Sequence, residues 1–531
     1  MSTGGLSISG TEYQREQGIA DSPELHEEDF FAWGEDPDPY WVEYYTQNSR
    51  TEIGDWLQAL GIEWEGVFRL PGNSVPRFHL TEGRGLGLVT PIYREVLRYP
   101  NVTFRWNFKV TELIVDQGVV AGVRGENLRT GQQDEIRAVR VLIATGGFQS
   151  NLELVRRFWP EELEEATDLL VGSGPNSVGS GLELAEQVEA AFHRMDHQWN
   201  YPWGLPHPSY PGEGRALSAD NRNSIWVNAQ GERFVNEQQS SRYLFPAVVE
   251  QRPSTYWAIF DEDGKGAFLI SGSGWNDPVR VETEILDNAE LTKAATSIRD
   301  LADAIGMDVA ALSATVGRFN ELVELGVDED FGRFSIDDEV PATAKIETAP
   351  FYAIQFFPMT RKSMGGIAID NAARVVREDG VVIPGLYASG ETTGFAGVNG
   401  SAGLEGTFLG PALLTGRVAG QTMVAEVGET RALATPQPEP RVTSAERVGG
   451  SAVDNADCDA CHSLPQLLTE REGYAHFERV HRIVVDERID CRGCHEEMIP
   501  FNPLSHQIDR IAQTDNCVQC HLANEQTLLP Q

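Results

Sequence analysis

Hydrophobic and polar positions alternate between residues 101 and 147, a pattern typical of half-buried β-strands. The pattern predicts strands at residues 102–106, 110–115, 119–124 and 139–144. The last strand, in VRVLIATGG, becomes continuously apolar and ends in two glycines. Such a run favours a buried parallel strand whose glycines let the backbone come close to a ligand.

Three further stretches have the apolar spacing of helices, at residues 51–61, 90–99 and 182–192. The third follows the loop VGSGPNSVGSG, whose small residues suit a phosphate or a ribityl chain.

Residues 255–352 lack the alternating, glycine-rich pattern and combine a strand with helical stretches, which predicts a separate α+β insertion. Within them, TYWAIFD predicts a strand, and residues 288–304 and 308–324 predict helices. From Phe351 the alternating, glycine-rich pattern resumes and leads into the helical stretch GTFLGPALLTGRVAGQTMVAEV. The chain therefore returns to its first domain, and the predicted fold class is α/β with an inserted α+β domain.

Composition and charge exclude several classes of protein. The 531 residues include 42 basic and 80 acidic side chains, for a formal net charge of −38. This balance excludes a nucleic-acid binder held by phosphate contacts, which needs a basic face. With 41% hydrophobic and 23% charged residues the chain is globular. No apolar run reaches the roughly 18 residues of a membrane-spanning helix, so the protein is not predicted to be transmembrane.

All six cysteines lie in the last 74 residues, in three C-x-x-C-H units. This unit is the attachment signature of c-type haem, in which two thiols bond the porphyrin and the adjacent His binds the iron. Zinc sites would use the C-x-x-C units in pairs and leave one unpaired, and a thioredoxin-like motif does not occur in threes. The predicted thioether residues are Cys458, Cys461, Cys491, Cys494, Cys517 and Cys520, and the predicted iron ligands are His462, His495 and His521.

Histidine counting tests the haem hypothesis independently. Six of the 11 histidines lie in this tail, which is the number that three irons with two axial ligands each require. The remaining three are His476, His481 and His506, and Met498 is the alternative axial ligand. The pairing of these ligands with particular haems stays open. Twelve acidic residues against six arginines in the tail imply a redox partner that accepts an acidic face.

Five strings then become recognisable together: VLIATGGFQSN, ERFVNE, SMGGIAID, IPGLYASGETTG and LGPALLTGRVAG. In this order, over about residues 3–428, the chain resembles the FAD-binding family of soluble fumarate reductases, flavocytochromes c, urocanate reductase-like enzymes and 3-ketosteroid dehydrogenases. The resemblance implies FAD, a mobile capping domain, and hydride transfer between flavin N5 and a carbon–carbon bond. The implied domains are an FAD-binding domain at 1–235 and 351–428, a capping domain at 236–350, a Pro-rich linker at 429–457, and a small, mostly helical or irregular triheme cytochrome domain at 458–531.

The resemblance also carries over cofactor-binding residues. Gly146 and Gly147 would lie at the flavin nucleotide, and Gly390 with Glu391 at the ribityl and phosphate region. Further implied contacts are Gly365 and Gly366 near the isoalloxazine ring, Leu404 at the start of a loop facing the pyrimidine edge, and Gly5, Ser7, Gly10, Val110 and Thr145.

At the substrate site the sequence departs from the fumarate reductases. They have His-Thr-Met-Gly-Gly where this chain has Lys362 after Arg361, and an Arg where this chain has Gly403 followed closely by Glu405. Fumarate itself is therefore not the expected substrate.

The implied catalytic residues are Lys362 for the substrate and His207, in a His-Pro pair like that of the family. Arg242 is the implied proton donor, with Tyr243 as the alternative acid.

The family normally opens with a strand, a G-x-G-x-x-G turn and a helix, which are not found here. GGLSISG resembles the segment that follows that unit. There is also no signal peptide, although haem attachment takes place outside the cytoplasm in bacteria. Both observations favour a sequence truncated at its amino end, rather than a short protein completed by another subunit.

The leading hypothesis is a periplasmic or otherwise extracytoplasmic flavocytochrome c oxidoreductase. It would reduce a small enoate-like substrate and exchange electrons through three haems with a quinol-linked membrane cytochrome or a periplasmic cytochrome. The alternatives are a 3-ketosteroid-type dehydrogenase and an electron-transfer module without flavin catalysis.

Overall fold

The computed structural model describes residues 3–105, 108–128, 131–272, 275, 277–335 and 344–427. The predicted linker and the cysteine-rich tail lie outside the described residues, and so do all the predicted haem-binding cysteines and histidines. No helix in the described ranges combines the length and hydropathy that spanning a bilayer requires.

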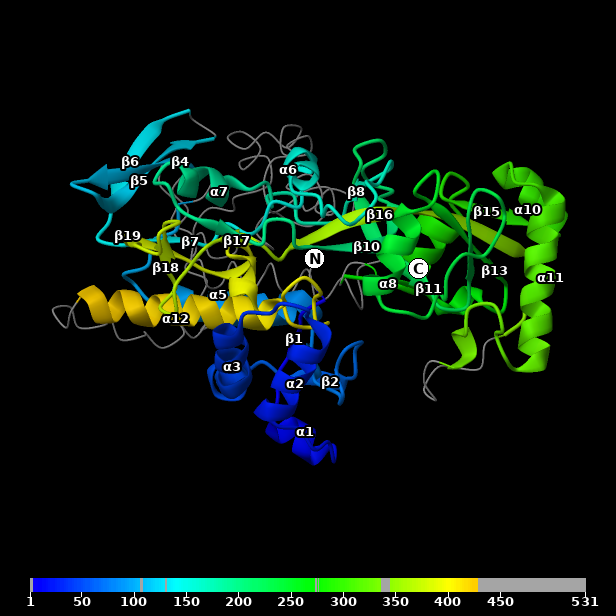
Figure 1. The fold of residues 1–531 in the computed structure, drawn as a ribbon, viewed down its shortest axis with the longest axis horizontal. Coiled ribbons are helices and arrows are strands. Elements are labelled where there is room, and N and C mark those ends of the chain that lie inside the picture. The colour runs from blue at the N-terminus through cyan, green and yellow to red at the C-terminus, as the bar shows by residue number, and fades with distance from the viewer. Residues whose placement is uncertain are drawn as a thin grey trace, which may run out of the picture.

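A small mixed sheet forms the centre of the first domain (Figure 1). β7 (Val141–Ile143) runs parallel to β19 (Val382–Ala388), which pairs on its other edge with β18 (Arg374–Val376). The parallel strand predicted in VRVLIATGG is thus confirmed. It is less buried than predicted, because among the described strands β7 pairs only with β19, and Leu142 is 36% exposed.

An antiparallel sheet of three strands packs beside it. The strands are β4 (Phe108–Asp116), β5 (Val119–Asn127) and β6 (Gln133–Arg137), which confirm the predictions at 110–115 and 119–124. The predicted strand at 102–106 is wrong over its described residues 102–105. That segment packs on a helix instead, where the Phe104 ring lies 5.4 Å from the Tyr93 ring and the Val102 amide donates to the Tyr99 carbonyl at 3.0 Å.

The amino-terminal part adds a three-stranded sheet and a layer of helices. β1 (Gly5–Ser7) and β2 (Trp64–Phe68) both pair with β3 (Phe78–Thr81). The predicted helix at 51–61 is a π-helical turn, η1 (Ser49–Asp55), followed by α4 (Trp56–Ala59). The other helices of this part are α1 (Glu12–Glu16), α2 (Pro23–Trp33), α3 (Pro39–Asn48) and α5 (Arg84–Leu97).

Shorter elements connect the two halves. The predicted helix at 182–192 ends early, as α7 (Ser180–Glu186), because Glu189 takes a positive φ of 58° that a helix does not allow. The remaining elements of this part are α6 (Leu152–Arg157), β9 (Phe192–His193), β17 (Gly366–Ile367), η6 (Gly390–Thr392), η7 (Gly394–Gly397) and the long helix α12 (Leu409–Val427).

The second half of the molecule is built on an eight-stranded sheet (Figure 1). Its strands are β8 (Leu170–Val171), β10 (Gln198–Pro206), β11 (Ala216–Asn221), β12 (Ile225–Val227), β13 (Tyr256–Asp261), β14 (Phe268–Ile270), β15 (Thr292–Ala295) and β16 (Phe351–Ser363). The predicted strand TYWAIFD is confirmed as β13. Because β10 and β11 belong to this sheet, it begins before the predicted boundary at residue 236.

Helices pack against this sheet. They are α8 (Ser241–Val249), α9 (Pro278–Val281), α10 (Ile298–Ile305) and α11 (Val309–Leu325), with the short turns η2 (Lys265–Ala267), η4 (Glu282–Leu286) and η5 (Arg333–Ser335). α11 confirms the helix predicted at 308–324. The helix predicted at 288–304 is wrong in its first half, where β15 pairs with β16. The helix begins later, as α10, with Ser297 as its N-cap.

β16 joins the two halves. Its 13 residues pair with β13, β15, β10 and β8, and the chain then turns through Gly365 into β17. At this turn the backbone passes so close to its neighbour that a Cβ on Gly365 would lie 1.7 Å from the Arg194 carbonyl oxygen. Only glycine fits there.

We predict that Gly365→Ala lowers the stability of the protein by about 3 kcal/mol, because the new methyl group meets backbone rather than a flexible side chain. Gly420→Ala is the control: a Cβ there meets nothing within 4 Å and lies inside α12. It should leave the protein as stable or slightly more stable. The midpoint of urea unfolding measures both, and equal midpoints for the two variants would contradict the prediction.

Candidate active site

Three strand ends meet at one edge of the small mixed sheet. The Ser389 amide, after β19, donates to the Ile143 carbonyl at 3.0 Å. The Phe148 amide, after β7, donates to the Ser363 hydroxyl at 3.0 Å, and the Ser363 amide donates to the Glu391 carboxylate at 3.0 Å. The carboxyl ends of parallel strands are where open α/β sheets bind ligands.

The predicted residues Thr145, Gly146, Gly147, Gly390 and Glu391 all lie at this edge. A Cβ on Gly147 would lie 2.4 Å from the Ser363 hydroxyl and 2.5 Å from the Glu391 carboxylate, so this glycine lets the β7 and β16 ends touch. Gly146 has a φ of 75°, and a Cβ there would meet only the Ser177 hydroxyl, at 3.6 Å. Gly146 therefore leaves its side open, while Gly147 closes the contact behind it.

The amino-terminal segment reaches the same region through the glycine-rich stretch before α12. The Ser7 amide donates to the Gly406 carbonyl at 2.9 Å, and the Ser7 hydroxyl lies 3.3 Å from His26 Nε2. Gly5 lies beneath the Phe78 ring, and Leu404 is buried in the same core as β1. The structure thus brings the predicted residues of β1 next to the predicted loop.

Two predicted cofactor residues lie further from this junction. Gly10 has a φ of 65°, and its carbonyl accepts a hydrogen bond of 2.9 Å from Arg15. Val110 lies on β4 and packs on the apolar core that contains Ile143.

A buried ion network that the sequence did not reveal supports β1. The Arg77 side chain is 0% exposed and donates to the Asp21 carboxylate at 2.9 Å and to the Asp29 carboxylate. Nearby, burial lowers the pKa of His79 to about 4, and Thr11 holds its ring at 2.8 Å. These residues are spread over 69 positions, from 11 to 79, and no local spacing links them.

Lys362 occupies the end of β16, opposite Trp199 of β10. Its ammonium group lies 3.5 Å from the centre of the Phe408 ring and 3.4 Å from the Tyr201 hydroxyl. Burial lowers the pKa of Lys362 to about 7, against the opposing effect of the Glu405 carboxylate. The side chain nevertheless keeps some exposed surface, so it can meet a ligand.

Among the described carboxylates, Glu405 has the largest electrostatic effect on the pKa of Lys362. Burial raises the pKa of Glu405, and the Lys362 ammonium is the strongest influence that lowers it. Arg361, the neighbour of Lys362, donates to the Gly172 carbonyl at 2.7 Å. We call Tyr201, Arg361, Lys362, Glu405 and Phe408 the Lys362 cluster.

Arg242 and Tyr243 approach the same glycine-rich stretch from α8. Arg242 donates to the Trp33 carbonyl and to the Glu35 carboxylate, the latter at 2.7 Å. The Trp33 indole N–H in turn donates to the Gly403 carbonyl at 3.0 Å. The Tyr243 ring lies edge-on to Trp33 at 6.3 Å and is 52% exposed. Trp33 therefore lies between the predicted proton donors and the stretch that carries Glu405.

His207 is not brought to this cluster. It follows the end of β10, eight residues beyond Trp199, which corresponds to roughly 25 Å along a strand. Its ring lies 4.7 Å from the Tyr210 ring and 6.1 Å from the Trp275 ring.

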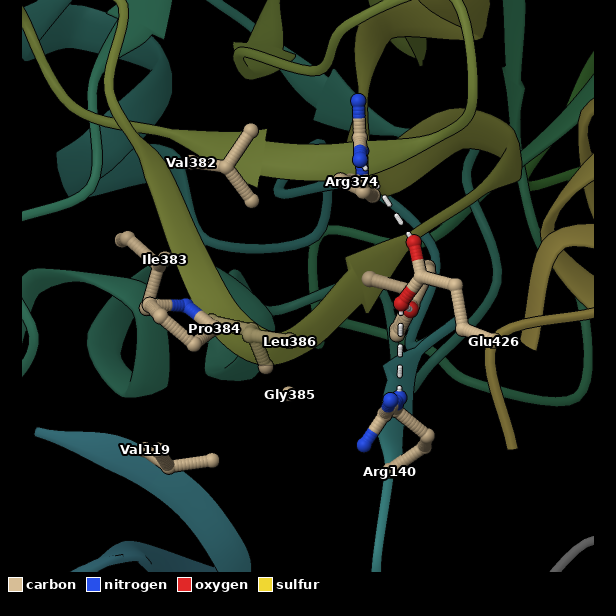
Figure 2. Close-up of a pocket in the computed structure, with 10 residues that line it drawn as sticks. Val119, Arg140, Arg374, Val382, Ile383, Pro384, Gly385, Leu386 and Glu426 are labelled. Carbon is tan, nitrogen blue, oxygen red and sulfur yellow. Dashed lines mark hydrogen bonds and ion pairs between the residues drawn. The ribbon is translucent and has the colours of Figure 1, made fainter. Parts of the chain in front are cut away.

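A hollow of about 370 Å³ lies at the opposite end of β19 (Figure 2). Val382, Ile383 and Pro384 line its apolar side. Its charged groups already pair with one another, since Glu426 lies 3.5 Å from both Arg140 and Arg374. This hollow is therefore separate from the glycine-lined edge.

Comparisons with known proteins identify the family of this chain and several relatives. Residues 1–409 match the family of the FAD binding domain. The chain is 31% identical over 432 residues to a fumarate reductase (cytochrome) of Shewanella frigidimarina, covering 79% of this chain and 69% of that protein. It is 30% identical over 492 residues to a KsdD-like steroid dehydrogenase of Mycolicibacterium smegmatis, covering 77% and 88%.

A solved structure gives the same result. The open conformation of a flavocytochrome c3 fumarate reductase matches with a TM-score of 0.64 and 26% identity, over 80% of this chain and 70% of that chain.

The residues at the glycine-lined edge fit a flavin nucleotide. Gly146 presents open backbone at the end of β7. Three residues on, the amide of Gln149 is fully buried, and neither its nitrogen nor its oxygen has a partner in the described part of the chain. In the same described part, no group of three or more His, Cys, Asp or Glu residues could hold a metal ion.

We predict that turnover of a carboxylate substrate depends on the protonation of Lys362. The cation that binds a carboxylate is present below a pKa of about 7 and is lost above it, so kcat/KM should fall as pH rises through neutrality. Glu405 and Glu391 oppose this lowering of the pKa and Arg361 adds to it.

The measurement is the pH profile of kcat/KM for the wild type and for Lys362→Arg and Lys362→Met. Arginine stays charged, so Lys362→Arg should keep its rate at alkaline pH, whereas Lys362→Met should be slow at every pH. Identical profiles for wild type and Lys362→Arg would rule out this role.

Proposed function

This chain belongs to the family of the FAD binding domain, and on that premise we propose that it reduces the C=C bond of an enoate-like molecule other than fumarate. It is an FAD-dependent oxidoreductase whose relatives include a fumarate reductase and a steroid dehydrogenase. The observation that carries the proposal is the placement of Lys362 directly before the turn that meets the β7 and β19 ends.

The chain's own residues divide the work as follows. Thr145, Gly146, Gly390 and Glu391 would hold FAD, which supplies a hydride when it is bound. Lys362 binds the substrate carboxylate or carbonyl and draws electron density from the double bond.

The second hydrogen is a proton, which Arg242 delivers to the other carbon of the bond. A guanidinium can do so only when it is resupplied, because its pKa is above about 12. Here the Glu35 carboxylate lies 2.7 Å from Arg242 and 2.9 Å from the Ser401 hydroxyl, and it is 64% exposed, so it can take protons from solvent. Tyr243 stays the alternative acid.

Electrons reach the flavin, in this proposal, through three c-type haems in the tail. The six cysteines from Cys458 to Cys520 attach them, and the six tail histidines bind the irons. The single-electron carriers would connect the two-electron flavin to a quinol-linked membrane cytochrome or a periplasmic cytochrome. Such a chain would work in the periplasm or another extracytoplasmic compartment.

A 3-ketosteroid-type dehydrogenase is the second candidate, favoured by the similarity to the steroid dehydrogenase relative and by Gly403 in place of a cationic clamp. An electron-transfer module without flavin catalysis is the third. The absorbance spectrum distinguishes the flavin enzyme from this third candidate: the enzyme should show flavin absorbance beside the haem bands, and the electron-transfer module should show haem bands alone.

We predict that at least one of Arg242→Ala and Tyr243→Phe lowers the rate of reduced-viologen oxidation by an enoate about 10²-fold, the usual contribution of a positioned proton donor. Arg252→Ala is the matched control, since Arg252 also lies 2.7 Å from a glutamate, Glu164, on the surface. It should leave the rate within about twofold. Unchanged rates in both test variants would remove these residues as donors.

We predict three haems c per chain in protein matured by a haem-attachment system, measured as the pyridine haemochrome. Replacing Cys458 and Cys461 with Ala should lower the count to two. Replacing His476, His481 or His506 singly should convert one haem from low spin to high spin in its absorbance spectrum. Stoichiometric zinc without haem would contradict the assignment.

A further inference from the structure

Glu405 stands on a tightly fixed turn. Its carbonyl accepts a hydrogen bond of 3.3 Å from the Asn73 side chain, and the next residue, Gly406, has a φ of 89°. The Gly406 carbonyl holds the Ser7 amide at 2.9 Å, and the Thr407 hydroxyl lies 2.5 Å from the Asn399 side chain. The backbone therefore fixes where the Glu405 carboxylate can lie.

This carboxylate shares its surroundings with Lys362 without pairing with it. No ion pair of 4.0 Å or less joins either residue to another among the described residues. Within the described part of the chain, the one hydrogen bond of the Lys362 ammonium goes to the Tyr201 hydroxyl, at 3.4 Å. Lys362 thus keeps donors for a ligand, and the Glu405 carboxyl group lies close enough to influence the charge of Lys362.

Aromatic and apolar side chains and one further cation, Arg361, complete the surroundings. The Phe408 ring lies 3.5 Å from the ammonium group and belongs to a small buried cluster. The other cation, Arg361, is held by the Gly172 carbonyl at 2.7 Å. The buried members of the cluster are Trp199, Met364, Phe395, Ala402 and Phe408.

We propose that Glu405 determines specificity by admitting substrates with one carboxylate or carbonyl group on an otherwise apolar molecule and by repelling dicarboxylates. This inference rests on the proposed function, since it places the substrate's acceptor on Lys362. A second carboxylate directed toward Glu405 would meet another carboxylate and aromatic rings, because the other cation, Arg361, is directed to the Gly172 carbonyl. Like charges in surroundings of low dielectric repel strongly.

The test is calorimetric titration of the full-length protein with two ligands of the same carbon frame, succinate and monomethyl succinate. Wild type should bind the monoester at least tenfold more tightly, because esterification removes only the second charge. Glu405→Gln should reduce that preference to threefold or less by tightening succinate, and Glu405→Asp, which keeps the charge, should retain it.

Equal or tighter binding of succinate by the wild type overturns the proposal, and so does an unchanged preference in Glu405→Gln. The comparison of the two ligands on the wild type decides the matter even if a variant fails to fold. Reduced-viologen assays with fumarate and 3-phenylacrylate then test the proposed function separately. Absence of turnover with every enoate, together with the expected ligand preference, would refute the reductase and leave the specificity of the site standing.

Discussion

The site depends on one steric constraint, the crossing of backbones where β16 leaves the large sheet. A Cβ on Gly365 would lie 1.7 Å from the Arg194 carbonyl, and one on Gly366 would lie 2.2 Å from the Thr392 carbonyl. Gly147 imposes the same restriction from the β7 side, against Ser363 and Glu391. Since side chains are excluded at this crossing, the strand ends touch through backbone and short hydrogen bonds.

This crossing also sets the position of the charged chemistry. β16 pairs along its length with β13 and β10, so its register fixes Lys362 opposite Trp199. The crossing then fixes the end of the strand against Glu391 through the Ser363 amide. A slip of one residue would turn Lys362 to the opposite face of the sheet. The same strand pairing therefore holds the large sheet together and sets the direction of the Lys362 side chain.

The sequence predicts the features that local pattern encodes. β13 and α11 follow from alternation and helical spacing, and the glycine strings identify the edge at Gly146 and Gly147. The sequence misassigns residues 292–295 because a strand that forms only by pairing with distant β16 has no local signature. The Lys362 cluster has no local signature either: the family resemblance places Arg361, Lys362 and Glu405 at the substrate site, but Tyr201 and Phe408 join them only through the fold. Lys362 and Glu405 are 43 positions apart, and only the fold shows that they act on each other.

Trp33 connects the proposed proton donor to this arrangement. Its carbonyl accepts from Arg242, its ring lies 5.3 Å beneath the guanidinium, and its indole N–H holds the Gly403 carbonyl. Arg242 lies on α8 and Gly403 in the glycine-rich stretch before α12, so one aromatic residue contacts both. Arg242, the proposed proton donor, and the stretch that carries Glu405 both contact Trp33. The position of α8 therefore affects the proposed proton delivery. A displacement of α8 that breaks the contact with Trp33 would also move Arg242 relative to Glu35, its proposed source of protons.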